Sequence, residues 1–240
     1  PLAPALAARV SLHAGPAPLF DVLGLDREIE KVLRPKVWLK SGGYLVIEQT
    51  EALVSIDVNT GKYVGASNPE ETVLRTNLEA AEEIGRQLRL RDLGGIIVVD
   101  FIDVVSQESW NQVLTALDEA LRKDRARTKV VGLGGLGLVQ LTRKRTRPGV
   151  GTELTRPCPL CSGHGRVKAP ETVAREALSE LVRLAPFVEG HDVVVRVHPE
   201  VAPALRLSLE TAGAAICAEV AARVRVEEDP STRPDRFEVL

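Results

Sequence analysis

The sequence predicts a mixed α/β protein with a large first part, a short cysteine-containing connector and a small second α/β part. Between residues 37 and 142, short runs of Val, Ile and Leu alternate with segments whose apolar residues recur at helical spacing. Residues 146–167 lack this periodicity and are rich in Pro, Gly and Cys, which is typical of a linker. Strand and helix patterns return afterwards in a unit of about seventy residues, a size at which a domain that folds by itself is only marginally stable.

The first elements are short. The opening thirty residues are rich in Pro and Ala, and a helix is expected at 26–33, ending before Pro35. Two β-strands are expected at 45–47 and 53–58, joined by a hairpin. Residues 59–61 (Asn-Thr-Gly) end the second strand with side chains that favour turns.

A long helix follows with a clear start. Asn68 is expected to cap it, Pro69 to take the first helical position and Glu71 to complete a capping box. Gly94-Gly95 is expected to end it, and the continuous apolar run 96–101 predicts a buried central strand. The apolar face of this helix comprises Leu74, Leu78, Ala81, Ile84 and Leu88.

The remaining elements complete the alternation. A second amphipathic helix begins at Ser106, with Trp110, Val113, Leu114, Leu117 and Leu121 on one face. Beyond it we expect strands at 129–131 and 138–141, then a helix at 171–184, a strand at 192–197, a helix at 201–209 and a strand at 218–226.

Composition excludes some functions. Apolar residues make up 44% and charged residues 27%, as in ordinary globular proteins, and no window approaches the roughly 18–20 apolar residues of a membrane helix. Aromatic residues are only 3%, so a nucleic-acid platform of stacked rings is not expected. The net charge is −2, yet residues 143–168 hold seven Lys or Arg against Glu153. That stretch, which begins with Arg143, Lys144 and Arg145, is either a phosphate-binding patch or a solvated basic turn.

Two acids stand at the ends of apolar strands. Asp57 ends Ser-Ile-Asp and Asp100 ends Val-Val-Asp, and a carboxylate in such a run is costly to bury unless it is paired or bound to a cation. If the strands are neighbours, both carboxylates can reach one Mg²⁺, which takes one or two carboxylates and keeps several waters. Asn59 points to the same side as Asp57 and can orient a ligand, whereas Asp103 is a weaker candidate. The alternative is that both acids cap loops or pair with arginines.

Other nuclease and nucleotide chemistries lack their residues. The four histidines are scattered and none is near either acid in sequence, so a metal-free ribonuclease with a histidine pair is not indicated. A Gly-x-x-x-x-Gly-Lys-Ser/Thr loop is absent, which argues against a nucleotide triphosphatase. A metal-activated water attacking phosphorus fits the available groups better.

The cysteines predict a metal knuckle. Cys158 and Cys161 form Cys-x-x-Cys on a Pro/Gly turn, which can aim two thiolates at one zinc ion in a reducing, cytoplasmic setting. A structural zinc needs four ligands, so His164, the distant Cys217 or a second copy of the chain must complete the site, and the second copy is the simplest completion. A redox pair is the rival interpretation.

Several motifs together resemble one family. In order along residues 19–168, they closely resemble the ribonuclease E/G family, and the region beyond residue 170 is more weakly similar to the small C-terminal domain of the ribonuclease G branch. The motifs are Ser41–Tyr44, Thr50–Ala52, Ser55–Gly61, Thr76–Ala81, Arg86–Gly95, Val99–Asp103, Asp124–Arg127, Leu141–Arg145 and Cys158-Pro159-Leu160-Cys161.

The resemblance implies an organisation. Residues 34–153 would be a DNase I-like catalytic subdomain with a mixed sheet, 154–168 a zinc-link knuckle and 169–240 a small α/β C-terminal domain. Residues 1–33 would be the tail of an upstream RNase H-like segment, and the S1 RNA-binding domain and the 5′-monophosphate sensor would lie before residue 1. Cys158 and Cys161 would share one Zn²⁺ with a second protomer, and these homodimers would pair into tetramers.

The resemblance also implies an activity. Asp57 and Asp100 would hold a catalytic Mg²⁺, with Asn59 supporting them through a hydrogen bond. An activated water would cut AU-rich single-stranded RNA, leaving 5′-phosphate and 3′-hydroxyl ends, in messenger decay and ribosomal RNA processing.

Two alternatives are a non-catalytic, zinc-linked RNA-binding or assembly module and a chaperone-like zinc module. The second is disfavoured because DnaJ-type proteins carry several tandem copies of the Cys motif.

Overall fold

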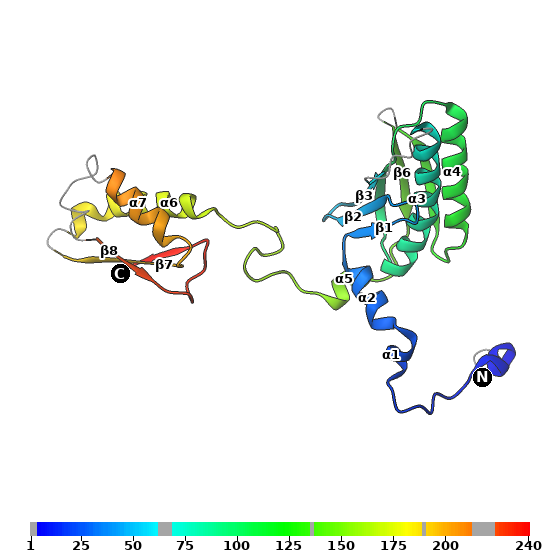
Figure 1. The fold of residues 1–240 in the computed structure, drawn as a ribbon, viewed down its shortest axis with the longest axis horizontal. Coiled ribbons are helices and arrows are strands. Elements are labelled where there is room, and N and C mark those ends of the chain that lie inside the picture. The colour runs from blue at the N-terminus through cyan, green and yellow to red at the C-terminus, as the bar shows by residue number, and fades with distance from the viewer. Residues whose placement is uncertain (1–3, 62–68, 135–136, 189–190, 213–223) are drawn as a thin grey trace. The chain divides into compact units, whose positions relative to one another are not determined.

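The chain folds as two compact units, Pro1–Thr155 and Arg156–Leu240 (Figure 1). The computed structural model describes residues 4–61, 69–134, 137–188, 191–212 and 224–240. The first unit contains a six-stranded mixed sheet and the second a three-stranded sheet, which confirms the predicted mixed α/β class. In the described residues, no helix is both long enough and apolar enough to cross a bilayer.

The sheet of the first unit has the strand order β1-β2-β3-β4-β6-β5. Among its described pairings, β3 with β4 is parallel and the others are antiparallel, because helix α3 carries the chain back to the starting edge between them. The elements are β1 (Lys36–Trp38), β2 (Tyr44–Gln49), β3 (Leu53–Asn59), α3 (Pro69–Arg91), β4 (Gly95–Asp100), α4 (Gln107–Arg122), β5 (Thr128–Leu133), β6 (Leu138–Arg143) and the short α5 (Val150–Leu154).

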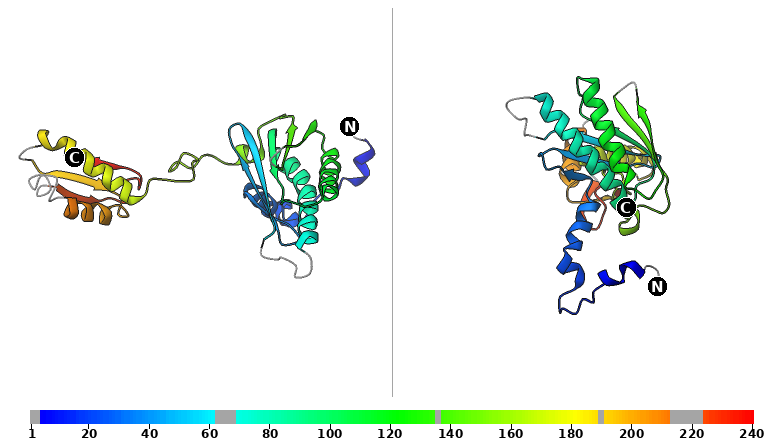
Figure 2. Two further views of the ribbon diagram at one scale, coloured as in Figure 1. Left: turned by 90° about the horizontal axis from the view of Figure 1, so that it is seen from above. Right: turned by 90° about the vertical axis from the view of Figure 1, so that its right-hand side faces the viewer.

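The core lies between this sheet and the helices α3 and α4, which run side by side along one of its faces (Figures 1 and 2). The helices approach closely: a methyl group on Gly85 would lie 2.7 Å from Cβ of Ala120. Alternate strand residues such as Ile56 and Val99 are buried against the helices. The opposite face, here called the open face, carries the intervening exposed and half-buried residues of the strands, including Ser55, Asp57 and Asp100.

The start of α3 at Pro69 agrees with the prediction, whereas the expected cap Asn68 lies outside the described residues. At the other end the sequence pointed to Gly94-Gly95, but the helix ends at Arg91 and the left-handed residue is Asp92, with φ of 49°. Helix α4 begins as predicted, and Oγ of Ser106 accepts a hydrogen bond of 3.0 Å from the backbone N–H of Ser109.

The segment before the sheet contains a 3₁₀ turn (Pro4–Arg9) and two short helices, α1 (Leu19–Leu23) and α2 (Leu25–Leu33). The sequence pattern predicts α2 but neither α1 nor β1. Neither helix contains a buried residue, and several apolar side chains of α1 are exposed. This part of the chain therefore contributes little to the core of the first unit.

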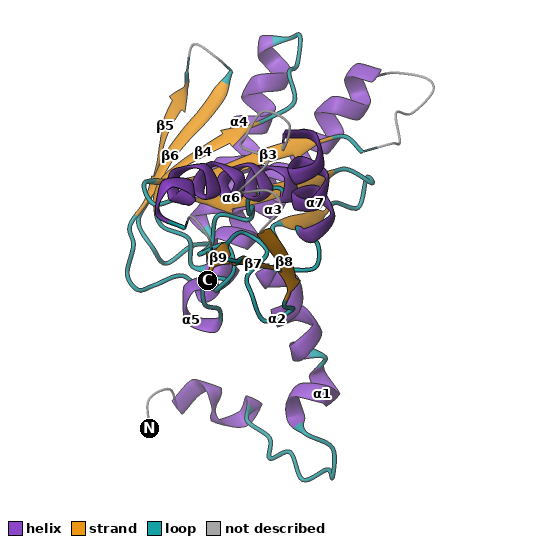
Figure 3. Cartoon of the chain, turned by 90° about the vertical axis from the view of Figure 1, so that its left-hand side faces the viewer, coloured by secondary structure: helices purple, strands orange, loops and turns teal. Residues whose placement is uncertain are grey.

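The second unit packs α6 (Pro170–Leu184) and α7 (Ala202–Ala212) along one face of a sheet with the order β8-β7-β9 (Figure 3). Its strands are β7 (Val193–Val197), β8 (Val224–Glu228) and β9 (Phe237–Val239), with β8 parallel and β9 antiparallel to β7. The predicted strand 218–226 overlaps β8, and its residues 218–223 lie outside the described residues. Fully buried side chains such as Leu181, Val195 and Leu205 give this unit a core of its own.

Candidate active site and metal-binding knuckle

Asp57 and Asp100 are direct register partners on the neighbouring parallel strands β3 and β4. Aligned residues of a parallel pair project to the same face, so both carboxylates stand on the open face, on strands whose backbones are about 4.8 Å apart. Both side chains are exposed, and Val46 and Leu138 flank the pair in the same register row. The condition on which the metal hypothesis depended, that the two strands be neighbours, is therefore met.

Asn59 supports this pair directly. Its Nδ2 donates a hydrogen bond of 2.8 Å to Oδ2 of Asp57, which holds one carboxylate in a fixed orientation. Two exposed carboxylates with an amide beside them are a suitable oxygen-donor set for Mg²⁺, which keeps the rest of its shell for water and phosphate. Asp103 is exposed in the loop that follows β4 and is not aligned with the other two in the sheet.

The loop after Asp100 is anchored by a residue that the sequence analysis did not assign a role. The side chain of Asn77, on α3, is fully buried and bonds both backbone groups of Ile102: Nδ2 donates to the carbonyl at 2.7 Å, and Oδ1 accepts from the N–H at 3.1 Å. This pair of hydrogen bonds fixes the backbone two residues beyond Asp100. A signal was present in the sequence, since Asn77 is a polar residue next to the apolar face of a helix.

Arg143 is buried, so neither interpretation of the basic stretch, a phosphate-binding patch or a solvated turn, describes this residue. Only 4% of its side chain is exposed, and its guanidinium bridges Asp92 at 2.8 Å and Asp124 at 2.7 Å. The hydrogen bond from Arg143 is the main cause that lowers the pKa of Asp92. For Asp124, burial opposes ionisation but is outweighed by hydrogen bonds from Arg143 and the amide of Ala126, so its pKa is also lowered. We therefore assign Arg143 a structural role.

Lys144 and Arg145 are exposed, as a phosphate contact requires, but they are distant from the acids. The pairing of β4 with β6 aligns Gly95 with Arg143 and Asp100 with Leu138. The basic residues thus follow the end of β6 that lies five strand residues, or roughly 17 Å, from Asp100. RNA that contacted both places would have to run along the sheet.

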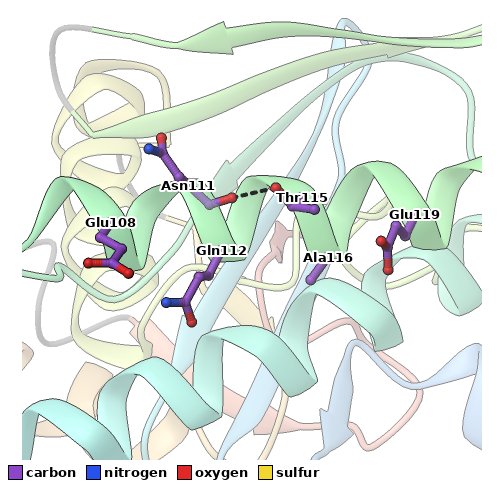
Figure 4. Close-up of a pocket in the computed structure, with 6 residues that line it drawn as sticks. All are labelled: Glu108, Asn111, Gln112, Thr115, Ala116 and Glu119. Carbon is purple, nitrogen blue, oxygen red and sulfur yellow. Dashed lines mark hydrogen bonds between the residues drawn. The ribbon is translucent and has the colours of Figure 1, made fainter.

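A pocket of about 570 Å³ includes Asn59, the hydrogen-bond partner of Asp57, and is lined by Lys36, Trp38, Gly42, Tyr44, Asn59, Thr60 and Gly61. Trp38 and Tyr44 meet edge to face with ring centroids 5.3 Å apart. The low aromatic content led us to expect no ring platform, yet two of the few rings gather here. A second concavity, on the outer side of α4, is lined by Glu108, Glu119, Asn111 and neighbouring residues without any cation, which makes it a poor site for a polyanion (Figure 4).

The cysteine loop belongs to the second unit. Cys158 and Cys161 are free thiols, and Sγ of Cys161 accepts a hydrogen bond of 3.3 Å from the N–H of Gly165. The pKa of Cys158 is lowered by the backbone N–H groups of Cys161 and Leu160 and by the neighbouring thiol of Cys161. Thiolates stabilised by amides on a tight turn fit a zinc site.

Arg233 anchors the cysteine loop: its guanidinium donates hydrogen bonds to the carbonyl oxygens of Pro159 and Leu160. The same guanidinium forms an ion pair with Asp235 at 2.9 Å. Within the described residues no group of three or more His, Cys, Asp or Glu side chains could hold a metal, and Cys217 lies outside them. The described part of one chain therefore offers two thiolates of the four ligands that a structural zinc needs.

Comparison with known proteins gives consistent matches. The model of the "Ribonuclease E/G family" matches residues 1–146. Ribonuclease G of Salmonella typhimurium is 42% identical over 237 residues, covering 99% of this chain and 48% of the relative, and ribonuclease G of Haemophilus influenzae is 44% identical over 239 residues with the same shares. Ribonuclease E of Escherichia coli is 42% identical over 175 residues, covering 73% of this chain and 16% of the relative. The chain thus spans about half the length of its ribonuclease G relatives.

Proposed function

The chain belongs to the ribonuclease E/G family, and from this premise we propose that it carries the catalytic site of a magnesium-dependent endoribonuclease acting on single-stranded, AU-rich RNA. The observation that carries the proposal is the register pairing of Asp57 with Asp100 on the open face, with Asn59 bonded to Asp57. The cellular roles that we propose are messenger decay and ribosomal RNA processing in the cytoplasm.

The residues divide the work. Asp57 and Asp100 would hold Mg²⁺, and Asn59 would orient the Asp57 carboxylate through the hydrogen bond that it donates to Oδ2. Bound magnesium would supply an activated water and neutralise the charge on the phosphodiester. Attack of that water on phosphorus would break the bond to the 3′ oxygen and leave 5′-phosphate and 3′-hydroxyl ends. Asn77 holds the loop beyond Asp100 in place, and Lys144 and Arg145 would bind phosphates farther along the strand.

We assign the cysteine knuckle an assembly role. Cys158 and Cys161 would provide two thiolates, and the same pair from a second protomer would complete a four-thiolate Zn²⁺ site that joins a homodimer. Dimers would then pair into a tetramer. The arrangement is supported by the amide-stabilised turn, and within the described part of one chain no group of three or more His, Cys, Asp or Glu could hold a metal.

The first test is cleavage of a labelled AU-rich single-stranded RNA with and without Mg²⁺. Asp57→Asn and Asp100→Asn are each expected to abolish cutting, because each removes a charged ligand. Glu48→Gln is the matched control, since Glu48 of β2 is exposed on the open face, as the acids are, but lies outside their register row. As the ribonuclease G relatives are about twice as long, the assay should use both this chain and a fusion that adds the part of a relative that this chain does not match. Cutting that survives both Asp variants would refute the metal site, and RNA binding without magnesium-dependent cutting in either protein would favour the non-catalytic module.

The second test counts zinc. The shared site predicts about one zinc per two chains, and Cys158→Ser should remove the metal and the dimer. His164→Ala is the control that separates ligand sets: zinc content and dimerisation should not change if the ligands are four thiolates. An unchanged dimer in Cys158→Ser, measured by light scattering, would contradict the shared-zinc proposal.

A further inference from the structure

We infer that the pocket lined by Lys36, Trp38 and Tyr44 binds a nucleobase of the RNA strand next to the scissile phosphodiester, so that these residues select and position substrate. The inference rests on the proposed function for the identity of the strand. It concerns residues outside the acid pair and reverses the expectation that aromatic stacking plays no part in this chain.

The pocket walls come from two neighbouring strands. Trp38 of β1 and Tyr44 of β2 are register partners, which places both rings on the open face. Trp38 is 65% exposed, whereas tryptophan side chains are on average highly buried. An exposed ring beside a half-buried one, both lining a concavity, is a typical ligand surface.

The pocket is continuous with the acid pair. Tyr44 and Asn59 are register partners that line the same pocket, and Asn59 bonds Asp57, so Asn59 connects the pocket to the acid pair. The rings lie in the next row on the same face, two residues or roughly 7 Å along the strands from the acids, with Tyr44 one strand and Trp38 two strands away from β3. A phosphodiester at the acids would thus have its adjacent nucleotide within reach of the rings.

Glycines shape the two backbone segments at one end of the pocket. Gly42 and Gly61 have φ of 88° and 69°, a region that favours glycine. A methyl group at Gly43 would lie 2.6 Å from the carbonyl oxygen of Asn59, and one at Gly61 would collide with the carbonyl oxygen of Gly42. The backbone of residues 42–43 therefore packs directly on the backbone of residues 59–61, and a side chain at Gly43 or Gly61 would push apart the two segments that form this end of the pocket.

Lys36 defines the chemistry of the occupant. Its Nζ lies 4.2 Å from the Trp38 ring centroid and 3.5 Å from that of Tyr44. A cation–π contact at an exposed site is weaker than the stacking of a base on an aromatic ring, so an arriving base can displace the ammonium. The displaced Lys36 then becomes a partner for the phosphate of that nucleotide. A base with its phosphate matches this combination of ring and cation better than an apolar peptide does.

The test uses Trp38 as its own reporter. The sequence contains two tryptophans, so Trp110→Phe leaves Trp38 alone, and Asp100→Asn in the same protein prevents cutting. The probes are hexauridylate and an abasic ribose-phosphate strand of equal length. Hexauridylate should quench Trp38 fluorescence and the abasic strand should not. Equal effects of the two strands, or none from either, would overturn the inference.

Variants separate base binding from chemistry. In the protein with Asp100 intact, Trp38→Ala should raise KM for RNA cleavage about tenfold with little change in kcat, and Trp38→Phe should restore most of the loss because it keeps a ring. Phe187→Ala is the matched control, as Phe187 is an 82% exposed ring in the second unit, and it should change neither constant. An unchanged KM in Trp38→Ala, or a loss of dimer in that variant, would overturn the inference and in the second case assign the surface to another copy of the chain.

The two proposals fail separately. Quenching by hexauridylate without cleavage by any form of the protein would leave the base pocket standing and refute the endonuclease. Magnesium-dependent cleavage with no response of Trp38 to base-containing RNA would do the reverse.

Discussion

Replacing Arg143 with methionine should strongly destabilise the first unit. The guanidinium is buried between Asp92 and Asp124, whose side chains are 7% and 5% exposed, and methionine would leave Asp124 without its arginine while Asp92 keeps Arg147 at 2.6 Å. Removing one partner of a buried pair costs about 3–5 kcal/mol, and since Asp92 retains a cation we expect the lower part of that range. This is a large part of the 5–15 kcal/mol that stabilises a typical domain.

The assay is urea unfolding followed by tryptophan fluorescence. Trp38 and Trp110 are the two tryptophans of the sequence and both lie in the first unit, so the signal reports on that unit even if the second unfolds separately. Lys144→Met is the matched control, because Lys144 is the next residue and is exposed, and it should change the free energy of unfolding by less than about 0.5 kcal/mol.

The pH dependence of the difference gives an independent check. The pKa values of Asp92 and Asp124 are lowered in the folded state, so their stabilising contribution is complete above the unfolded carboxyl pKa of about 4. It is lost as the pH falls through the lowered pKa values. The gap between native protein and Arg143→Met should therefore be full at pH 7 and shrink below about pH 4. A loss under about 1 kcal/mol, or a gap that stays constant down to pH 3, would refute this account of Arg143.

Three further predictions concern other contacts. Asn77→Ala removes both side-chain bonds to Ile102 and should cost about 1–3 kcal/mol in urea unfolding and lower kcat for RNA cleavage; unchanged kcat in a folded variant would deny that the loop positions Asp100. Gly85→Val adds bulk against Ala120 and should lower the melting temperature of the first unit, and an unchanged melting curve would show that the two helices can separate at no cost. Ser106→Ala removes the N-cap of α4 and should cost about 1 kcal/mol, with Ser106→Asp retaining the stability in the same unfolding assay.

The long elements could be predicted from the sequence because periodicity is a local property. Helices α3 and α4 and the strands β2, β3 and β4 have apolar patterns that a single segment displays on its own. The three-residue strands β1 and β9 have no measurable period, and they exist because a neighbouring strand pairs with them. Such edge strands are therefore beyond local reasoning.

The candidate site divides in a similar way. Asp57 and Asp100 were conspicuous because each ends an apolar run, but their alignment depends on the register of two strands separated by α3. Counting charges placed Arg143 in a basic patch, whereas the alternation Val139, Leu141, Arg143 along β6 already indicated the buried side. The aromatic pocket was missed because composition reports how many rings exist and says nothing of where they meet.

The parallel pairing of β3 with β4 also makes the site sensitive to chain length in an uneven way. A strand alternates its faces with each residue, so one residue inserted or deleted between Leu53 and Asp57 would turn the acid toward the helices and bring an apolar side chain outward. A point substitution on the open face alters one side chain, whereas such a register shift turns every later residue of the strand to the opposite face. The strands that carry the acids should therefore tolerate changes of residue far more readily than changes of length.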